Sequence, residues 1–122
     1  MGQPTKLMIV DDSSIIRKLI QNYLNEYNIE IVGEAGDGKS AVELFKQLRP
    51  DIVTMDIVMP EMDGLSVIDE IRKIDSSIKI MVVTALSDKS TGIEAIKRGA
   101  KSYVIKPFTP DKLKHAFSKL LQ

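Results

Sequence analysis

The chain has 122 residues, and its 17 basic residues are balanced by 17 acidic ones. This balance lacks the positive surplus on which non-specific nucleic-acid binding depends, so we expect no nucleic-acid partner. The absence of cysteine excludes disulfides, a thiolate nucleophile and cysteine-ligated metal sites. No apolar run approaches the length of a membrane span, and two aspartates precede any signal-peptide core, so we expect a cytoplasmic protein that binds no membrane.

Strand-like and helix-like segments alternate along the chain. Short apolar runs predict strands over residues 6–10, 29–35, 51–55, 78–85 and 101–105. Helical spacing of apolar residues predicts helices over 14–27 and 38–48, and along stripes at 65–74, 93–96 and 113–120. Ser13 or Ser14 is the expected N-cap of the first helix, and Thr109 with Pro110 begins the last one. The second strand alternates like an edge strand, whereas the fourth is the most apolar and is expected to be central.

Five strand–helix repeats with short connections predict one α/β domain over residues 1–122, with no output domain. We expect a doubly wound sheet of five parallel strands with helices on both faces. Sheets of this kind bind ligands beyond the carboxyl ends of their strands. The chemistry of the chain is therefore expected at those ends.

Polar side chains follow four of the predicted strands. Asp11 and Asp12 come after the first strand, Asp56 after the third, Thr84 near the end of the fourth and Lys106 after the fifth. Three carboxylates would repel one another unless a hard cation neutralised them, and Mg²⁺ prefers such oxygen ligands. Lys106 and Thr84 would offer a positive charge and a hydrogen-bond donor to an oxyanion. An aspartate with a metal and such donors beside it is a phosphoryl acceptor, and we predict this role for Asp56.

Over essentially its whole length the sequence resembles the receiver domain of two-component response regulators, in particular the single-domain CheY-like chemotaxis regulators. The matching stretches are IVDDS, DIVTMDIVMPEMDGL, VVTA and GAKSYVIKPF, in this order. The resemblance implies the flavodoxin-like strand order 2-1-3-4-5, for which CheY-like proteins are a familiar example. It also implies a phosphoacceptor signalling protein, not an enzyme in the ordinary sense, since it catalyses only its own phosphorylation by a CheA-like histidine kinase and its own dephosphorylation.

The resemblance also implies a set of ligands for Mg²⁺. Asp12 and Asp56 resemble the direct carboxylate ligands, and Asp11 would act mainly through a bound water molecule. The backbone carbonyl of Val58 would be a further ligand.

Around the phosphoryl group, Thr84 and Lys106 match the residues that hold its oxygens, and Ala85 leaves room beside Thr84. The peptide bond between Lys106 and Pro107 is expected to be cis. Tyr103 matches an aromatic switch residue that turns inward as Thr84 moves toward the phosphoryl group. The face of the fourth helix, fifth strand and fifth helix would then change its affinity for a partner. Without the resemblance, Tyr103 would be interpreted as a half-buried aromatic residue of a strand.

Two residues beside the expected site depart from the best-known enteric chemotaxis pattern. Val58 and Leu86 are apolar, and their side chains should flank the path of a water molecule that attacks the phosphoryl group. We therefore expect slow self-dephosphorylation, and with it a dedicated phosphatase as a partner.

The output partner is open at this point. A flagellar motor switch protein is the first expectation and a phosphorelay role is the second; a receiver excised from a larger regulator is a third, although Met1 and the end after the last helix favour a complete protein. A haloacid-dehalogenase-like phosphatase also uses an aspartate nucleophile and Mg²⁺, but it needs a second aspartate where this chain has Val58. A flavin-binding module of the same topology would need a phosphate loop where this chain has residues 11–14, Asp-Asp-Ser-Ser.

Overall fold

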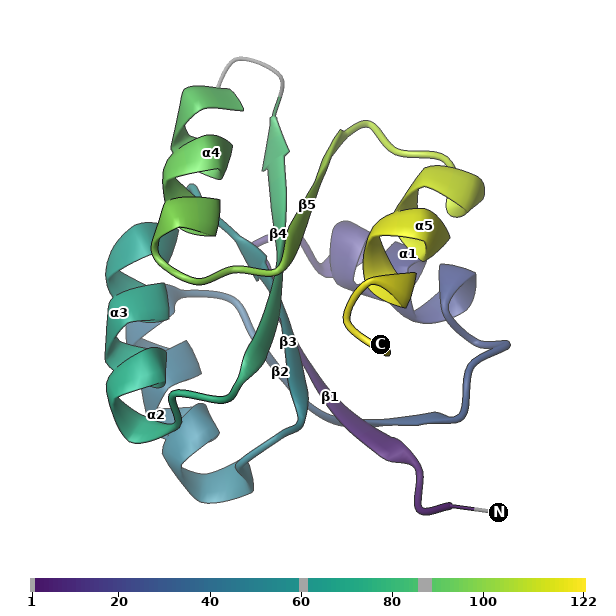
Figure 1. Ribbon diagram of the computed structural model, residues 1–122, viewed down its shortest axis with the longest axis horizontal. Coiled ribbons are helices and arrows are strands. Elements are labelled where there is room, and N and C mark those ends of the chain that lie inside the picture. Colours follow the sequence, from purple (N-terminus) through teal and green to yellow (C-terminus); the bar gives the residue numbers. More distant parts are fainter. Residues whose placement is uncertain (1, 60–61, 86–88) are drawn as a thin grey trace.

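The computed structural model describes residues 2–59, 62–85 and 89–122. In chain order the described elements are β1 (Thr5–Val10), α1 (Ser14–Tyr23), β2 (Ile29–Ala35), α2 (Gly38–Leu48), β3 (Ile52–Asp56), α3 (Gly64–Ile74), β4 (Lys79–Ala85), α4 (Lys89–Lys97), β5 (Ser102–Lys106) and α5 (Pro110–Ser118). Helices α2, α3 and α4 cover one face of the sheet, and α1 and α5 cover the other (Figure 1). Within the described ranges, no helix has the length and apolar character needed to cross a membrane.

The sheet has five parallel strands in the order β2-β1-β3-β4-β5. The predicted fold and strand order are confirmed, and β2 is an edge strand as expected. The fourth strand, expected to be central because it is the most apolar, is an interior strand between β3 and β5, and β3 is the middle strand. Every interior strand of this sheet is covered by helices on both faces, so apolar character does not distinguish the middle strand from its neighbour.

The core lies in two layers, one on each side of the sheet. Successive side chains of a strand point to opposite faces. In β3, Val53 and Met55 therefore pack toward α2 and α3, whereas Ile52 packs toward α1 and α5. Phe45 is the largest fully buried side chain of the first layer, and Phe117 has this position in the second.

Side-chain N-caps start four of the helices. The cap residues are Ser13, Asp37, Asp63 and Thr109, and each accepts a hydrogen bond from the backbone N–H three residues later. The predicted start of α5, with Pro110 as its first residue, is confirmed. Helix α1 ends at Tyr23, earlier than the predicted 27, although Leu24 is fully buried and Tyr27 packs on Phe117 with 5.2 Å between the ring centroids. A turn thus continues the apolar stripe after the helix has ended.

Candidate functional site

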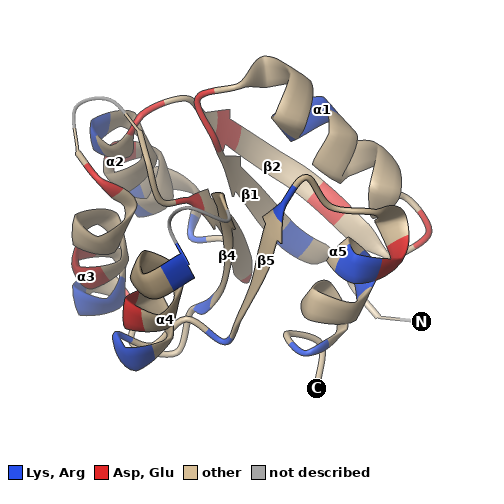
Figure 2. Cartoon of the chain, turned by 90° about the horizontal axis from the view of Figure 1, so that it is seen from above, with Lys and Arg blue, Asp and Glu red and all other residues tan. Residues whose placement is uncertain are grey.

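Three carboxylates meet at the carboxyl edge of the sheet. Strands β1 and β3 are neighbours in register, with Val10 opposite Met55, so Asp11 just after β1 comes close to Asp56 at the end of β3. One ligand oxygen each of Asp11, Asp12 and Asp56 lies within 4.8 Å of the others. Asp11 is fully buried, Asp56 is 6% exposed and Asp12 is exposed. Figure 2 looks down on this edge, where red segments lie around the strand ends and the end of β5 is blue.

Lys106 reaches this acidic cluster from the end of β5. Its Nζ lies 3.1 Å from Oδ2 of Asp11 and 3.4 Å from Oδ2 of Asp56. Burial and the charge of Asp11 raise the pKa of Asp56, although the nearby Lys106 ammonium opposes this shift. Burial lowers the pKa of Lys106, but the charges of Asp11 and Asp56 outweigh it and leave the pKa raised. Among the described residues, one ammonium lies beside three carboxylates, which leaves a negative site that favours a cation.

The acidic cluster fits a hard divalent cation. Oδ1 of Asp11 accepts a hydrogen bond of 2.9 Å from the backbone N–H of Ser13. Oδ2 of Asp11 is buried and, within the described part of the chain, has no well-oriented hydrogen bond, only the ion pair with Lys106. A buried oxygen of this kind beside two further carboxylates matches the oxygen ligands that Mg²⁺ prefers.

Strand β4 lies between the strands that carry Asp56 and Lys106. Thr84, its last residue but one, is buried, and its Oγ1 lies 3.3 Å from the carbonyl oxygen of Ala85. Ala85 is opposite Lys106 in the register of β4 and β5. The bond between Lys106 and Pro107 is cis.

Val58 lies beside the acidic cluster, two residues after Asp56. Its side chain is 61% exposed, and its backbone N–H donates a hydrogen bond of 3.3 Å to Oδ1 of Asp56. The other apolar residue expected beside the site, Leu86, lies outside the described residues. Of the two apolar residues, only Val58 lies within the described residues, so the prediction of slow dephosphorylation is tested at Val58.

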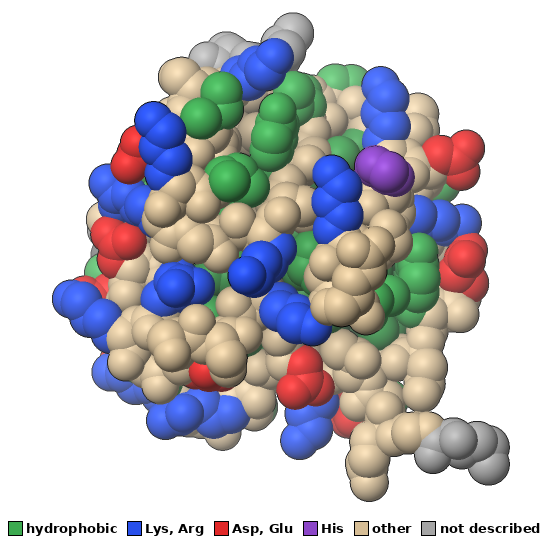
Figure 3. Space-filling view, viewed as in Figure 1, with side chains coloured by type: hydrophobic (Ala, Val, Ile, Leu, Met, Phe, Trp, Pro, Cys, Tyr) green, Lys and Arg blue, Asp and Glu red, His purple; other side chains and the backbone are tan. Residues whose placement is uncertain are grey.

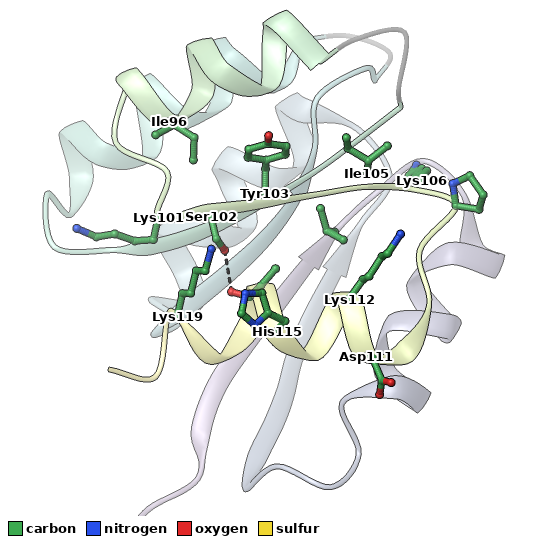
Figure 4. A pocket seen from close by; sticks show the side chains of 13 residues that line it. Ile96, Lys101, Ser102, Tyr103, Ile105, Lys106, Asp111, Lys112, His115 and Lys119 are labelled. Carbon is green, nitrogen blue, oxygen red and sulfur yellow. Dashed lines mark hydrogen bonds between the residues drawn. The ribbon is translucent and has the colours of Figure 1, made fainter.

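Tyr103 lies apart from the acidic cluster, on the same strand as Lys106. It is half-buried and lines a groove of about 900 Å³ between α4, β5 and α5. In Figure 4 the ring of Tyr103 rises from β5 beside Ile96, whereas Lys112 and His115 of α5, and Lys119 just after it, line the opposite side. Lysines and apolar side chains share this face, with the single histidine among them (Figure 3). We call this the α4–β5–α5 groove.

Two residues that the sequence did not single out also contribute. Arg17 of α1 donates a hydrogen bond to the backbone carbonyl of Asp11. Gly92 of α4 is buried against Thr84 and Tyr103. Glycine is unfavourable inside a helix, and Gly92 directly precedes the predicted apolar stripe at 93–96, so it was the available signal for a close contact there. The contact of Arg17 depends on tertiary structure and left no comparable signal.

The chain matches the response regulator receiver domain family over residues 7–118. The chain belongs to this family. Chemotaxis protein CheY of Thermotoga maritima is 45% identical over 94% of this chain and 96% of that protein. Chemotaxis protein CheY of Bacillus subtilis is 42% identical over 95% of this chain and 97% of that protein. A crystal structure of a CheX–CheY–BeF₃–Mg²⁺ complex from Borrelia burgdorferi is 29% identical, with a TM-score of 0.92 over 99% of this chain and 92% of that chain.

The chain is therefore a CheY-like receiver domain of a two-component response regulator. Receiver domains of this kind are signalling proteins and generally not enzymes. Family membership decides between this interpretation and the two competing classes, the haloacid-dehalogenase-like phosphatase and the flavin-binding module. The acidic cluster then corresponds in position to a receiver-domain metal site.

Proposed function

We propose that this receiver domain accepts a phosphoryl group on Asp56 from a histidine kinase and then binds a partner through the α4–β5–α5 groove. The observation that carries the proposal is the convergence of Asp11, Asp12 and Asp56, with the ammonium of Lys106 3.4 Å from Asp56. An acceptor carboxylate, a cation-binding set and a fixed ammonium are what phosphoryl transfer to an aspartate requires.

In the transfer step, a carboxylate oxygen of Asp56 forms a bond to phosphorus. The bond between phosphorus and the kinase histidine nitrogen breaks, and its electron pair leaves with that nitrogen. Lys106 neutralises charge on one phosphoryl oxygen, and the hydroxyl of Thr84 donates to another. Ala85 leaves space for the group beside Thr84.

The residues that would hold Mg²⁺ are Asp11, Asp12, Asp56 and the backbone carbonyl of Val58. When bound there, Mg²⁺ would stabilise the negative charge on the phosphoryl oxygens. The support is the buried Oδ2 of Asp11 in the acidic cluster, whose charge is balanced, among the described residues, by the ion pair with Lys106. Lys106 also opposes the upward shift of the pKa of Asp56, which keeps more of the nucleophilic carboxylate form available.

The signal leaves the site through Thr84 and Tyr103. Both lie against Gly92 of α4, so a movement of Thr84 toward a phosphoryl group changes the packing that Tyr103 meets. Tyr103 lines the α4–β5–α5 groove together with the apolar residue Ile96 and several lysines, among them Lys101, Lys112 and Lys119. This chemistry suits a partner segment that carries both acidic and apolar side chains.

The partner that we propose is the flagellar motor switch in chemotaxis. The support is similarity to two proteins named chemotaxis protein CheY, each matched over more than nine-tenths of its length. A dedicated phosphatase is a second proposed partner. The exposed, apolar side chain of Val58 cannot hydrogen-bond an attacking water molecule, so the chain should lose its phosphoryl group slowly unless another protein assists. The CheX–CheY complex of Borrelia burgdorferi supports the idea that a second protein binds a receiver of this kind.

The test of phosphoryl acceptance is intact mass after incubation with acetyl phosphate, with and without Mg²⁺. Wild type should gain the mass of one phosphoryl group only with Mg²⁺, whereas Asp56→Asn should gain none. Asp51→Asn is the matched control, since Asp51 is an exposed aspartate before β3 and should not affect the gain. Absence of any gain in wild type would refute the proposed function.

Isothermal titration of a flagellar switch protein with phosphorylated and unphosphorylated chain tests the output. Tighter binding of the phosphorylated chain is expected. Equal binding of both forms would refute the chemotaxis output and leave phosphoryl acceptance standing.

A further inference from the structure

Arg17 joins the loop after β1 to the edge strand β2. Its Nη1 donates to the backbone carbonyl oxygen of Asp11, and its Nε lies 2.9 Å from Oε1 of Glu34. The Arg17 side chain is 20% exposed, and that of Glu34 is 42% exposed. The planar guanidinium thus uses two of its donors in fixed directions, which a flexible ammonium cannot do equally well.

The same loop is held from other directions as well. The backbone N–H of Asp11 donates to the carbonyl oxygen of Ala35 at 3.0 Å, and Oδ1 of Asp11 accepts from the N–H of Ser13 at 2.9 Å. The N–H of Arg17 donates to the carbonyl oxygen of Ser13 at 3.1 Å. With the carbonyl of Asp11 also fixed by Arg17, the backbone that carries two of the three carboxylates is tied to both α1 and β2.

Holding the carboxylates in place has a consequence for cation binding. Three neighbouring carboxylates repel one another, so a loosely held loop would move them apart whenever no cation is bound. A loop that is already held needs less reorganisation on binding, and groups that orient ligands in this way commonly change metal affinity by about 10–100-fold.

Two roles of Arg17 predict opposite effects. As a charge alone, a guanidinium near a cation site repels the cation, so its removal would tighten binding. As a support for the Asp11 backbone, its removal would weaken binding. The direct hydrogen bond to the carbonyl of Asp11, with the charge of Arg17 partly offset by Glu34, favours the second role.

We propose that Arg17, oriented by Glu34, is a positioning residue that holds Asp11 and Asp12 in the arrangement required to bind a divalent cation. This inference rests on the proposed function, because it assumes that the acidic cluster binds Mg²⁺. Arg17 itself contacts neither the cation nor the phosphoryl group.

The test is isothermal titration of Mg²⁺ into the metal-free chain. Arg17→Ala should weaken Mg²⁺ binding by about tenfold. Arg17→Lys should also weaken it, because the charge is kept but the two directed donors are lost. Glu34→Gln should weaken it by a smaller factor, since an acceptor for Arg17 remains.

Arg98→Ala is the matched control. Arg98 likewise uses its guanidinium for two contacts, an ion pair of 2.8 Å with Asp69 of α3 and one of 3.2 Å with Glu94 in α4, and both lie away from the β1–α1 loop. Arg98→Ala should lower the free energy of unfolding about as much as Arg17→Ala does, but it should bind Mg²⁺ with the affinity of wild type. A second readout is the Mg²⁺ concentration for half-maximal phosphorylation by acetyl phosphate, which should rise in Arg17→Ala while the rate at saturating Mg²⁺ changes little.

The outcomes separate the two claims. Unchanged or tighter Mg²⁺ binding by Arg17→Ala, in a wild-type background that binds Mg²⁺, would overturn the positioning role alone. If Arg17→Ala does not fold, unchanged binding by both Arg17→Lys and Glu34→Gln would overturn it equally. Absence of Mg²⁺ binding by wild type would overturn the proposed metal site, and the positioning role with it.

Discussion

Gly92 of α4 lies directly against Thr84 of β4: a Cβ atom on residue 92 would be 3.3 Å from Cγ2 of Thr84. The same Cβ would be 3.8 Å from Cδ2 of Tyr103. Glycine inside a helix is about 1 kcal/mol less favourable than alanine, so α4 carries this cost where it covers both residues of the proposed switch. The absence of a side chain at residue 92 therefore lets α4 pack closely against Thr84 and Tyr103.

Gly92→Ala should therefore stabilise the fold while restricting the switch. The free energy of unfolding should rise by up to about 1 kcal/mol, reduced by the small adjustment that a 3.3 Å contact demands. The added methyl group should hinder Thr84 and Tyr103, so the fluorine NMR signal of fluorotyrosine at position 103 should change less on phosphorylation than in wild type. Urea unfolding measures the first effect. Ser90→Ala, an exposed substitution in the same helix, is the control, and equal switching in both variants would contradict the prediction.

The acidic cluster could be predicted from the sequence because its geometry follows from the fold class. Parallel strands end at one edge of the sheet, so residues directly after the apolar runs, Asp11, Asp56 and Lys106 among them, had to come together. The fold itself followed from the alternation of strand and helix patterns and from the resemblance to receiver domains.

Contacts that depend on how elements pack were not predictable. The guanidinium of Arg17 reaches the Asp11 carbonyl across the space between α1 and the sheet, and no spacing in the sequence encodes that distance. The end of α1 was misplaced because Leu24 and Tyr27 keep a helical spacing while the backbone has already turned.

Val58→Asn should shorten the life of the phosphorylated state. Val58 is 61% exposed two residues after Asp56, and an amide there can hydrogen-bond a water molecule that attacks the phosphorus atom. If this hydrogen bond is about 1.4 kcal/mol stronger in the transition state than in the ground state, the loss of phosphate becomes tenfold faster. The loss is followed by intact mass after removal of acetyl phosphate. Val58→Ala, which opens the site without adding a donor, should be affected much less, and an unchanged or slower rate in Val58→Asn would refute the prediction.

Thr54→Val should stabilise the protein. Thr54 is fully buried on β3, between Ile9 of β1 and Met81 of β4, and its Oγ1 has no hydrogen-bond partner within the described ranges. Valine has nearly the same shape and removes the cost of burying that hydroxyl, so the free energy of unfolding should rise by about 1–2 kcal/mol. Urea unfolding measures it. Thr54→Ser keeps the hydroxyl and removes a methyl group, so it should be less stable than wild type; a loss of stability in Thr54→Val would instead indicate a water molecule bound to the hydroxyl.

The Asp63 cap should make stability depend on pH in the acid range. Oδ1 of Asp63 accepts from the backbone N–H of Ser66 at 3.0 Å, and this bond is the main reason that the pKa of Asp63 lies below its ordinary value of 3.8. A carboxyl whose pKa is lowered by folding stabilises the fold above its unfolded pKa, and this contribution is lost as the pH falls through the lower folded pKa.

Asp63→Ala removes the cap of α3 and should lower the free energy of unfolding by about 0.5–2 kcal/mol near pH 7. Asp63→Asn keeps a capping oxygen but cannot ionise, so its deficit should be a fraction of 1 kcal/mol, because the group is largely exposed to solvent. That deficit should shrink as the pH falls below the ordinary carboxyl pKa of 3.8, since wild type then loses its ionised cap while the variant does not change. Urea unfolding of the three proteins at several pH values measures these differences. If the difference in free energy of unfolding between wild type and Asp63→Asn stays constant down to the lowest pH measured, the charge of Asp63 contributes nothing. The cap would then act through its hydrogen bond alone.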